Sequence, residues 1–459
     1  MRKRIGLSLL FLVMAAPAPA QDRERNYTRP AVPAPADLDR LNLKLAWRTY
    51  LATDGRRDGL FSVQMLGDQI LVQNRSGMIT LLDAADGSTL WRAQPGKAYE
   101  VYQAPAHNSR SVFAIRGGIL YALDRKTGAR QWEFSLPHGA SAAPVADDER
   151  FYLCLLTREL YCYELPEISA AKARAARAEE EKSLGKAAPE APKKRATGAA
   201  DSDYGARRPP EPTGDLPRVP THLWTYGAET RLERVPLETQ DFLAVAGVDG
   251  IYFAASKYAG KLQYRLRAEA AVSAPLGQHG GTAYMASQDF NVYAVDITSG
   301  RILWRFTANG PIQRKPAVND QDVYVAPYRG GLSRVQRATG HEVWHNKDAN
   351  HFLAANPKFV YAADPTGRLL VLDRARGTQL SAYDARDFVV PVSNELTDRV
   401  FLAGNNGLLV CLRDRDYPDP LVMKNSAAAK PEGEAKPEGD QPPADLPAPK
   451  EGAGQAPAR

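Results

Sequence analysis

Residues 120–132 read LYALDRKTGARQW, and this stretch decides the fold. Its first four residues have the alternating character of a β-strand, and Asp124 follows with a carboxylate that can accept N–H groups of a turn. Gly128, four residues later, supplies the positive φ of a tight turn. Trp132 comes after another four residues and offers a flat aromatic surface for packing against a neighbouring unit. The stretch therefore predicts two antiparallel strands joined by an Asp–Gly turn.

The same four-plus-four spacing recurs along the chain. Two other copies keep all three residue types: Asp83, Gly87 and Trp91, and Asp296, Gly300 and Trp304. Three are degraded: Gln336, Gly340 and Trp344; Asp373, Gly377 and Ser381; and Ser256, Gly260 and Tyr264. This number of copies at one spacing is far beyond chance, so the chain is a repeat protein.

The aromatic positions have a period of about 40 residues once a low-complexity insertion is removed. They are Trp47, Trp91, Trp132, Trp224, Tyr264, Trp304 and Trp344. A period near 40 with four short strands per unit is typical of a propeller blade. Seven units have all four strands in sequence, and the strand at 41–47 completes the strands at 389–412. We therefore predict an all-β, eight-bladed β-propeller whose N-terminal strand joins the C-terminal blade and closes the ring.

Proline marks the first strand of several units. It stands at Pro105, Pro144, Pro275, Pro316 and Pro391. Proline cannot donate to a β-ladder and belongs on an edge strand. The innermost strand of a blade is such an edge, so these strands are expected beside the central channel.

The N-terminus predicts export. A basic start at residues 2–4, an apolar run at 5–14 and the small residues Ala18-Pro19-Ala20 form a signal peptide over residues 1–20. An uncleaved membrane anchor is the alternative. The first cysteine is Cys154, so no cysteine near the cleavage site can carry a lipid. We expect a periplasmic or secreted protein with no transmembrane span.

Composition divides the rest of the chain. Residues 21–40 are a polar lead-in, residues 41–166 and 221–415 hold the blades, and residues 167–220 interrupt one blade turn. The first part of the insertion could form a charged helix, but its overall composition and that of the tail, residues 416–459, predict disorder. A net charge of +6 without a basic run interleaved with aromatics excludes nucleic acid as the expected partner.

Three cysteines leave one question open. Cys154 and Cys162 flank a predicted hairpin turn, so a cross-strand disulfide is one interpretation. Cys411 stands at the same repeat position as Cys162 and Val371, which favours three small apolar core residues.

The repeated Asp-x3-Gly-x3-Trp element resembles the tryptophan-docking repeat of the pyrroloquinoline quinone (PQQ) propeller superfamily, over residues 41–415. The resemblance implies either a quinoprotein dehydrogenase or a scaffold without cofactor. The scaffold most similar to this chain is the propeller lipoprotein of the outer-membrane β-barrel assembly machinery. That similarity implies envelope proteins, among them outer-membrane assembly components, as partners of a monomeric propeller.

Reactive residues do not form a recognisable pattern. A quinoprotein dehydrogenase of this superfamily has two adjacent cysteines and a calcium ion held by Glu, Asn and Asp, whereas no two cysteines adjoin here. Asp414, Asp416 and Asp419 have the character of solvated turn residues. His341 and His345 lie on one strand face but about 13 Å apart, too far for one metal ion. The histidines as a group are expected at the surface or in turns.

We therefore expect no catalytic, metal or cofactor-binding residue, and a protein-interaction scaffold is the first hypothesis. A PQQ- and calcium-dependent dehydrogenase is the first alternative. A cell-wall or carbohydrate-binding propeller, suggested by Tyr50, Tyr258 and Tyr328, is the second.

Overall fold

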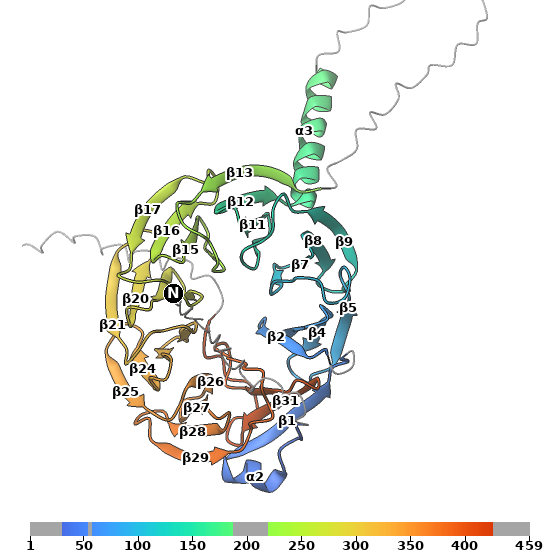
Figure 1. Cartoon of the computed structure of the whole chain (residues 1–459). Coiled ribbons are helices and arrows are strands. Elements are labelled where there is room, and N and C mark those ends of the chain that lie inside the picture. Colours follow the sequence, from blue (N-terminus) through green and yellow to red (C-terminus); the bar gives the residue numbers. More distant parts are fainter. Residues whose placement is uncertain (1–29, 54–56, 187–218, 426–459) are drawn as a thin grey trace, which may run out of the picture. The chain divides into compact units, whose positions relative to one another are not determined.

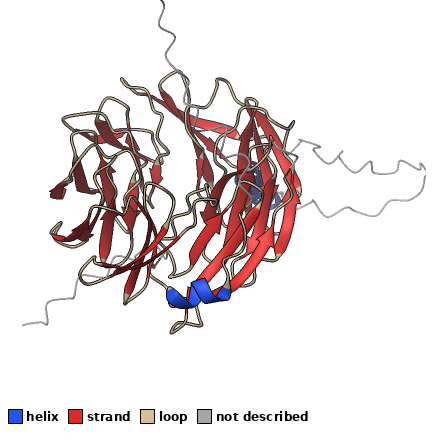
Figure 2. Cartoon of the chain, turned by 60° about the horizontal axis from the view of Figure 1, so that its bottom comes forward, coloured by secondary structure: helices blue, strands red, loops and turns tan. Residues whose placement is uncertain are grey.

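The computed structural model describes residues 30–53, 57–186 and 219–425 of the chain. These residues form eight antiparallel sheets arranged around a ring (Figure 1). Seven sheets contain four strands in sequence order, and the eighth contains three strands in the order β1-β31-β30. Strands make up most of each blade (Figure 2). The prediction of an all-β, eight-bladed propeller is confirmed.

The blades are numbered from the first complete sheet, and each strand list runs from the channel outward. Blade 1 is β2 (Leu60–Met65), β3 (Gln69–Asn74), β4 (Ile79–Asp83) and β5 (Thr89–Ala93); blade 2 is β6 (Ala106–His107), β7 (Ser111–Arg116), β8 (Ile119–Asp124) and β9 (Arg130–Ser135). Blade 3 is β10 (Val145–Ala146), β11 (Arg150–Cys154), β12 (Glu159–Glu164) and β13 (Thr221–Gly227); blade 4 is β14 (Leu237–Glu238), β15 (Phe242–Ala246), β16 (Ile251–Ser256) and β17 (Leu262–Arg267). Blade 5 is β18 (Gly277–His279), β19 (Thr282–Ala286), β20 (Asn291–Asp296) and β21 (Ile302–Thr307); blade 6 is β22 (Ala317–Val318), β23 (Asp322–Val325), β24 (Leu332–Gln336) and β25 (Glu342–Asn346). Blade 7 is β26 (His351–Ala355), β27 (Phe359–Ala363), β28 (Leu369–Asp373) and β29 (Gln379–Tyr383); blade 8 is β30 (Val400–Ala403), β31 (Leu408–Asp414) and β1 (Leu43–Tyr50).

The ring closes in blade 8, where β1 from the N-terminal end pairs with β31 from the C-terminal end. Trp47 lies opposite Cys411 in this pairing. The side chain of Asn42, just before β1, donates a 3.1 Å hydrogen bond from Nδ2 to Asp414. The outermost strand of the last blade is therefore supplied by the first strand of the chain.

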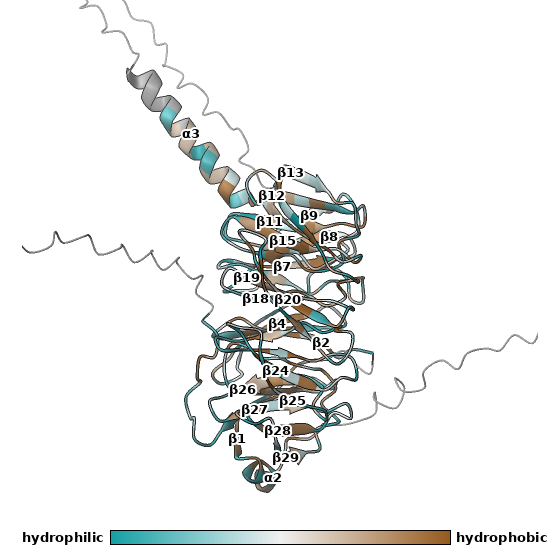
Figure 3. Ribbon diagram, turned by 90° about the vertical axis from the view of Figure 1, so that its left-hand side faces the viewer, coloured by the Kyte–Doolittle hydropathy of each residue, from teal (hydrophilic) through white to brown (hydrophobic). Residues whose placement is uncertain are grey.

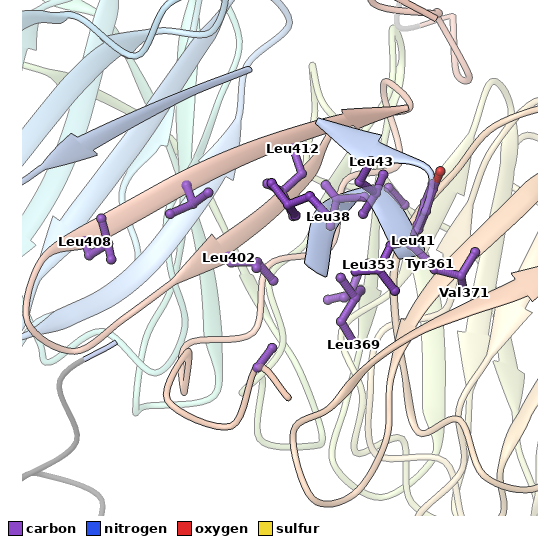
Figure 4. Close-up of a cluster of buried hydrophobic side chains, with 14 residues drawn as sticks. Leu38, Leu41, Leu43, Leu353, Tyr361, Leu369, Val371, Leu402, Leu408 and Leu412 are labelled. Carbon is purple, nitrogen blue, oxygen red and sulfur yellow. The ribbon is translucent and has the colours of Figure 1, made fainter. Parts of the chain in front are cut away.

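The lead-in, residues 21–40, ends in a helix, α2 (Pro35–Arg40), that the sequence analysis did not predict. Pro35 near its first position, Asp37 in the first turn and Arg40 in the last turn suit a helix of this direction. Leu38 is buried and packs with Leu41 in a cluster between blades 7 and 8 (Figure 4). The end of the lead-in, expected to be only polar, is thus part of the core.

Asp414 differs from its expected place as a solvated turn residue. It is 1% exposed, and its Oδ2 accepts 3.0 Å hydrogen bonds from the Tyr361 hydroxyl and from Asn356 Nδ2. Both donors belong to blade 7, so this carboxylate joins the closing blade to its neighbour.

The insertion begins as a helix rather than as disordered chain. Helix α3 (Pro166–Lys186) follows β12, and β13 then pairs with β12 as the fourth strand of blade 3. Its Ala, Glu, Lys and Arg residues have high helix propensity. Leu165 and Ser169 are buried at its base, and α3 extends away from the blade (Figures 1 and 3). The rest of the insertion, up to residue 218, lies outside the described residues.

The described chain also passes the expected C-terminal boundary at residue 415. Residues 416–425, here the C-terminal strap, run from blade 8 to blade 6. Met423 N–H donates to Leu396 O at 2.7 Å, and Asp320 N–H donates to Met423 O at 2.9 Å. The predicted disorder of residues 426–459 concerns residues outside the described part.

The prolines mark the inner edge of the sheets. β6, β10, β18 and β22 start one or two residues after a proline and are two or three residues long. In blade 8 the inner strand is reduced to one bridge, between Val390 and Ala403, beside Pro391. Because proline lacks an N–H, the inner edge offers few ladder donors.

All three cysteines are buried, unpaired thiols. Cys154 lies opposite Leu160 and Cys162 lies opposite Tyr152, so the two do not face each other across the hairpin. Burial raises the pKa of each thiol to about 12.

The ring has two faces that recur below. The Asp–Gly face carries the turns between first and second strands and between third and fourth strands. The opposite face carries the turns between second and third strands and the connections from one blade to the next.

Candidate functional site

The aromatic of one blade packs on the Asp–Gly turn of the next. The Trp91 ring lies against Gly128, where an added Cβ would come within 2.7 Å of ring atoms. Trp91 Nε1 donates a 2.8 Å hydrogen bond to the carbonyl of Arg125, directly after Asp124. Gly128 also has a φ of 72°, so both conformation and space require glycine.

The same geometry occurs at six junctions between blades. In each, the aromatic N–H or O–H donates to the residue after the Asp position, at 2.7–3.0 Å. The other five pairs are Trp47 on Gly87, Trp224 on Gly260, Tyr264 on Gly300, Trp304 on Gly340 and Trp344 on Gly377. Carboxylates at the Asp position accept turn N–H groups: Asp83 from Ala85, Asp124 from Thr127, Asp296 from Ser299 and Asp373 from Arg376.

Two of the eight junctions lack this contact between an aromatic ring and a glycine turn. The insertion replaces the Asp–Gly turn of blade 3, and there Trp132 Nε1 donates at 3.0 Å to the Glu167 carboxylate at the start of α3. Blade 7 has Ser381 in place of the aromatic. Beside it, Leu38 and Leu41 fill the junction with blade 8 (Figure 4).

Titratable residues do not gather into a reactive centre in the described ranges. No three His, Cys, Asp or Glu side chains there are placed to hold one metal ion, and the thiols are buried and separate. This arrangement does not fit the calcium and paired cysteines of a quinone site. His107 and His351 lie on inner strands, and burial lowers the pKa of each to about 4, which corrects the expectation of surface or turn histidines.

Exposed large apolar residues away from the outer strands are concentrated on the opposite face. Six lie there: Phe61, Tyr99, Val101, Leu156, Phe290 and Tyr328; Tyr50, the last residue of the outer strand β1, ends at the same face. Tyr258, Val422 and Val219 lie on the other side, by the Asp–Gly turns, the strap and the insertion. The six are distributed over several blades, and single exposed apolar side chains of this kind are common on protein surfaces. The three tyrosines of the carbohydrate hypothesis are divided, because Tyr258 is on the Asp–Gly face while Tyr50 and Tyr328 are opposite.

In two turns of that face, another residue stands where the equivalent turns of other blades have glycine. Six of its turns close with the same hydrogen bond, from N–H of residue i to O of residue i+4. Residue i+3 has positive φ in all six, and it is glycine in four: Gly77, Gly250, Gly367 and Gly407. In the other two it is Arg158 with φ of 68° and Phe290 with φ of 73°. The left-handed conformation costs a non-glycine residue about 1–2 kcal/mol.

Sequence reasoning missed these two residues. The signal was available, because aligning the turns between second and third strands places Arg158 and Phe290 over the glycines of other blades. Both side chains are exposed, and Leu156 in the same turn as Arg158 is 68% exposed. Arg158 and Phe290 cost conformational energy, and because their side chains are exposed they add little to the packing of the propeller. They are therefore the strongest candidates for contact with another molecule.

No helix in the described part is both long and apolar enough to traverse a bilayer.

The chain resembles known proteins over most of its propeller. The family model described as outer membrane protein assembly factor BamB matches residues 75–165 and 220–438, more than half of the chain. A BamB of Kangiella koreensis is 31% identical over 100 residues, which are 20% of this chain and a quarter of that relative's length.

Solved structures agree with the fold. The crystal structure of BamB from Moraxella catarrhalis matches with a TM-score of 0.58 at 15% identity, covering 82% of this chain and 98% of the other. The computationally designed protein Ika8 matches with a TM-score of 0.53 at 12% identity, covering 80% and 99%. At these identities the structures bear on the fold alone. On the family match, the chain belongs to the family described as outer membrane protein assembly factor BamB.

Proposed function

We propose that the protein is an exported, non-catalytic propeller that works as a protein-interaction scaffold in outer-membrane protein assembly. The observation that carries this proposal is the pair of strained, exposed residues Arg158 and Phe290 on the opposite face. The family assignment suggests the process, and the relative's printed role as an assembly factor suggests that the partners are other assembly components. A signal peptide over residues 1–20 would take the chain to the periplasm.

The two residues lie in blades 3 and 5, on either side of blade 4. Leu156 accompanies Arg158, and Tyr328 of blade 6 follows Phe290 around the ring, with the Arg329 guanidinium 5.2 Å from the Tyr328 ring centroid. Arginine and aromatic side chains are the types that dominate binding energy at interfaces. We define Leu156, Arg158, Phe290 and Tyr328 as the docking patch.

The ring gives this patch a fixed shape. Aromatic docking joins neighbouring blades, and an ion pair between Lys257 Nζ and Asp147 Oδ2, at 2.7 Å, joins blades 3 and 4 on the Asp–Gly face, across the ring from the patch. A surface that does not need to order itself on binding loses less entropy in the complex. A partner segment would therefore meet side chains already held in place.

Replacing Arg158 and Phe290 by glycine tests their role in binding without loss of stability. Arg158→Gly and Phe290→Gly each relieve about 1–2 kcal/mol of left-handed strain and cost about 0.5–1 kcal/mol of chain entropy, so neither variant should be less stable than the wild type. Crosslinking and pull-down from periplasm with wild-type protein should recover outer-membrane assembly components, and the double variant should recover far less. Tyr258→Ala, an exposed aromatic on the Asp–Gly face, is the matched control and should recover the wild-type amount.

Equal recovery by wild type and double variant would refute the docking patch. Recovery of glycan alone, or of no assembly component by the wild type, would refute the scaffold role itself. A quinoprotein activity, measured as substrate-dependent dye reduction after adding PQQ and calcium, would refute the non-catalytic part of the proposal.

A further inference from the structure

A cleft of about 510 Å³ lies on the Asp–Gly face between blades 6 and 7. Its blade walls are formed by Asn319, Asp320, Gln321, Arg334, Pro357, Arg374 and Ala375. The C-terminal strap supplies the remaining wall through Leu421, Val422 and Met423. A cleft of this size is in the range of small-ligand and peptide sites.

The polar wall carries two guanidinium groups and one buried carboxylate. Asp322, 1% exposed, lies 2.9 Å from Arg334 Nε and 2.7 Å from Arg374 Nη2. Arg374 also donates to the carbonyl of Asn356 and to Gln321 Oε1. Asp320 also lines the cleft, so this wall holds two guanidinium groups and two carboxylates, and its character comes from the donor groups and not from net charge.

Asn319 adds a buried donor. It is 2% exposed, and its Oδ1 accepts hydrogen bonds from the N–H groups of Gln321 and Asp322. Its Nδ2 has no acceptor within the described residues, and Arg334 Nε is close to Asp322 without directing its N–H at the oxygen. A buried donor without an acceptor costs about 1–3 kcal/mol. Both open positions are donors, so the complementary group must be an acceptor.

The one other acid at the rim is already engaged. Asp320 Oδ1 lies 2.7 Å from His279 Nε2 and accepts a 3.1 Å hydrogen bond from the Asn425 N–H. The strap wall is apolar, and Val422 is 66% exposed. The cleft therefore combines a donor-rich wall with an apolar wall.

We propose that this cleft binds a peptide carboxylate that adjoins an apolar side chain. The carboxylate would lie along the wall of Asn319 and Arg334, and the apolar group would contact Leu421, Val422 and Met423. The site lies on the other side of the ring from the docking patch and needs neither that patch nor an assembly partner. The carboxylate could come from a chain end or from an Asp or Glu side chain.

Asn319→Asp is the sharpest variant. It keeps the oxygen that accepts the two turn N–H groups, removes the Nδ2 donor and adds a negative charge. Asp147 holds the same turn position in blade 3 and accepts the N–H groups of Glu149 and Arg150, so the substituted turn has an internal precedent. Asn108→Asp, in the same turn of blade 2, is the control for the charge change; because Asn108 Nδ2 donates at 2.9 Å to the carbonyl of Asp147, its fold is checked by circular dichroism.

Fluorescence anisotropy on the full chain would use three labelled hexapeptides that end in Leu: one with a free C-terminal carboxylate, its C-terminal amide, and an amide with Glu before Leu. The free carboxylate should bind about tenfold more tightly than the plain amide, the difference of about 1.4 kcal/mol expected for a charge-assisted bond. Asn319→Asp should weaken that binding about tenfold, and Asn108→Asp should leave it unchanged.

If the Glu-containing amide also binds, the cleft accepts a side-chain carboxylate as well as a C-terminal one. If it does not bind, the cleft accepts only the C-terminal carboxylate of a chain. Either result, together with tight binding of the free acid, supports the proposal. Equal binding of acid and plain amide, no binding of any peptide, or wild-type affinity in Asn319→Asp would overturn the proposal.

Discussion

Replacement of one docking glycine by alanine tests how the blades are held together. Gly128 has φ of 72°, and a Cβ there would lie 2.7 Å from the Trp91 ring. Gly67 has φ of 81° but has no atom within 4 Å of the same position. Gly67→Ala therefore reports conformational strain alone, about 1–2 kcal/mol. Gly128→Ala adds overpacking of about 1–3 kcal/mol and loss of the Trp91 hydrogen bond, about 0.5–1.5 kcal/mol.

The expected difference between the two variants is about 1.5–4.5 kcal/mol. Urea unfolding followed by far-ultraviolet circular dichroism would measure it, with the slope of the transition checked for equality between variants. Native fluorescence should change in Gly128→Ala alone, because Trp91 must leave its site. Equal destabilisation of the two variants would show that the aromatic contact adds nothing to the strain, and the account of blade docking would be refuted.

Three further outcomes follow from the closing blade and the buried groups. Trp47→Ala removes the aromatic that joins blade 8 to blade 1 and should lower the free energy of unfolding by about 3–5 kcal/mol; a loss under 1 kcal/mol in urea unfolding would contradict this. Burial holds the His351 pKa at about 4, against 6.5 in the unfolded chain, so its contribution to stability is complete above pH 6.5 and is lost as pH falls toward 4. His351→Gln should flatten the stability profile in that window, and an unchanged profile would exclude the effect. The buried thiols, with pKa values raised to about 12, should react with a thiol reagent only after unfolding; rapid labelling of native protein at pH 8 would contradict their burial.

The repeat was predictable because its determinants are local. Asp124, Gly128 and Trp132 lie within nine residues, and turn conformation together with strand alternation fixes their spacing. The number of blades then followed from the period, and ring closure followed from an unmatched strand at each end of the repeat region. These inferences needed no knowledge of contacts between distant residues.

The predictions that were wrong concern residues whose burial depends on contacts with distant parts of the chain. Asp414 looks like a turn residue, but Tyr361 and Asn356, more than 50 residues away, bury it with hydrogen bonds. Leu38 lies in a polar segment and is buried by packing with Leu41 and with residues of blades 7 and 8, at the junction where Ser381 replaces the aromatic. The strap and its cleft depend on contacts with blade 6 that local composition does not encode.

Arg158 and Phe290 were not predicted as candidate contact residues for a different reason. Their turns look ordinary one at a time, and only comparison among the repeats shows that glycine is the usual residue there. Repeats thus supply an internal reference, against which a costly side chain stands out.

The pairing of β1 with β31 has a consequence for synthesis. Asn42 and Asp414, which meet at the junction, are 372 residues apart in sequence. β1, which is synthesised first, therefore has no pairing partner until β31 has been synthesised near the end of the propeller. A chain that is cut short before β30 never completes its last blade and leaves β1 without a partner, and an open strand of this kind is prone to pairing with other chains. Closure of the ring therefore distinguishes a finished molecule from a truncated one.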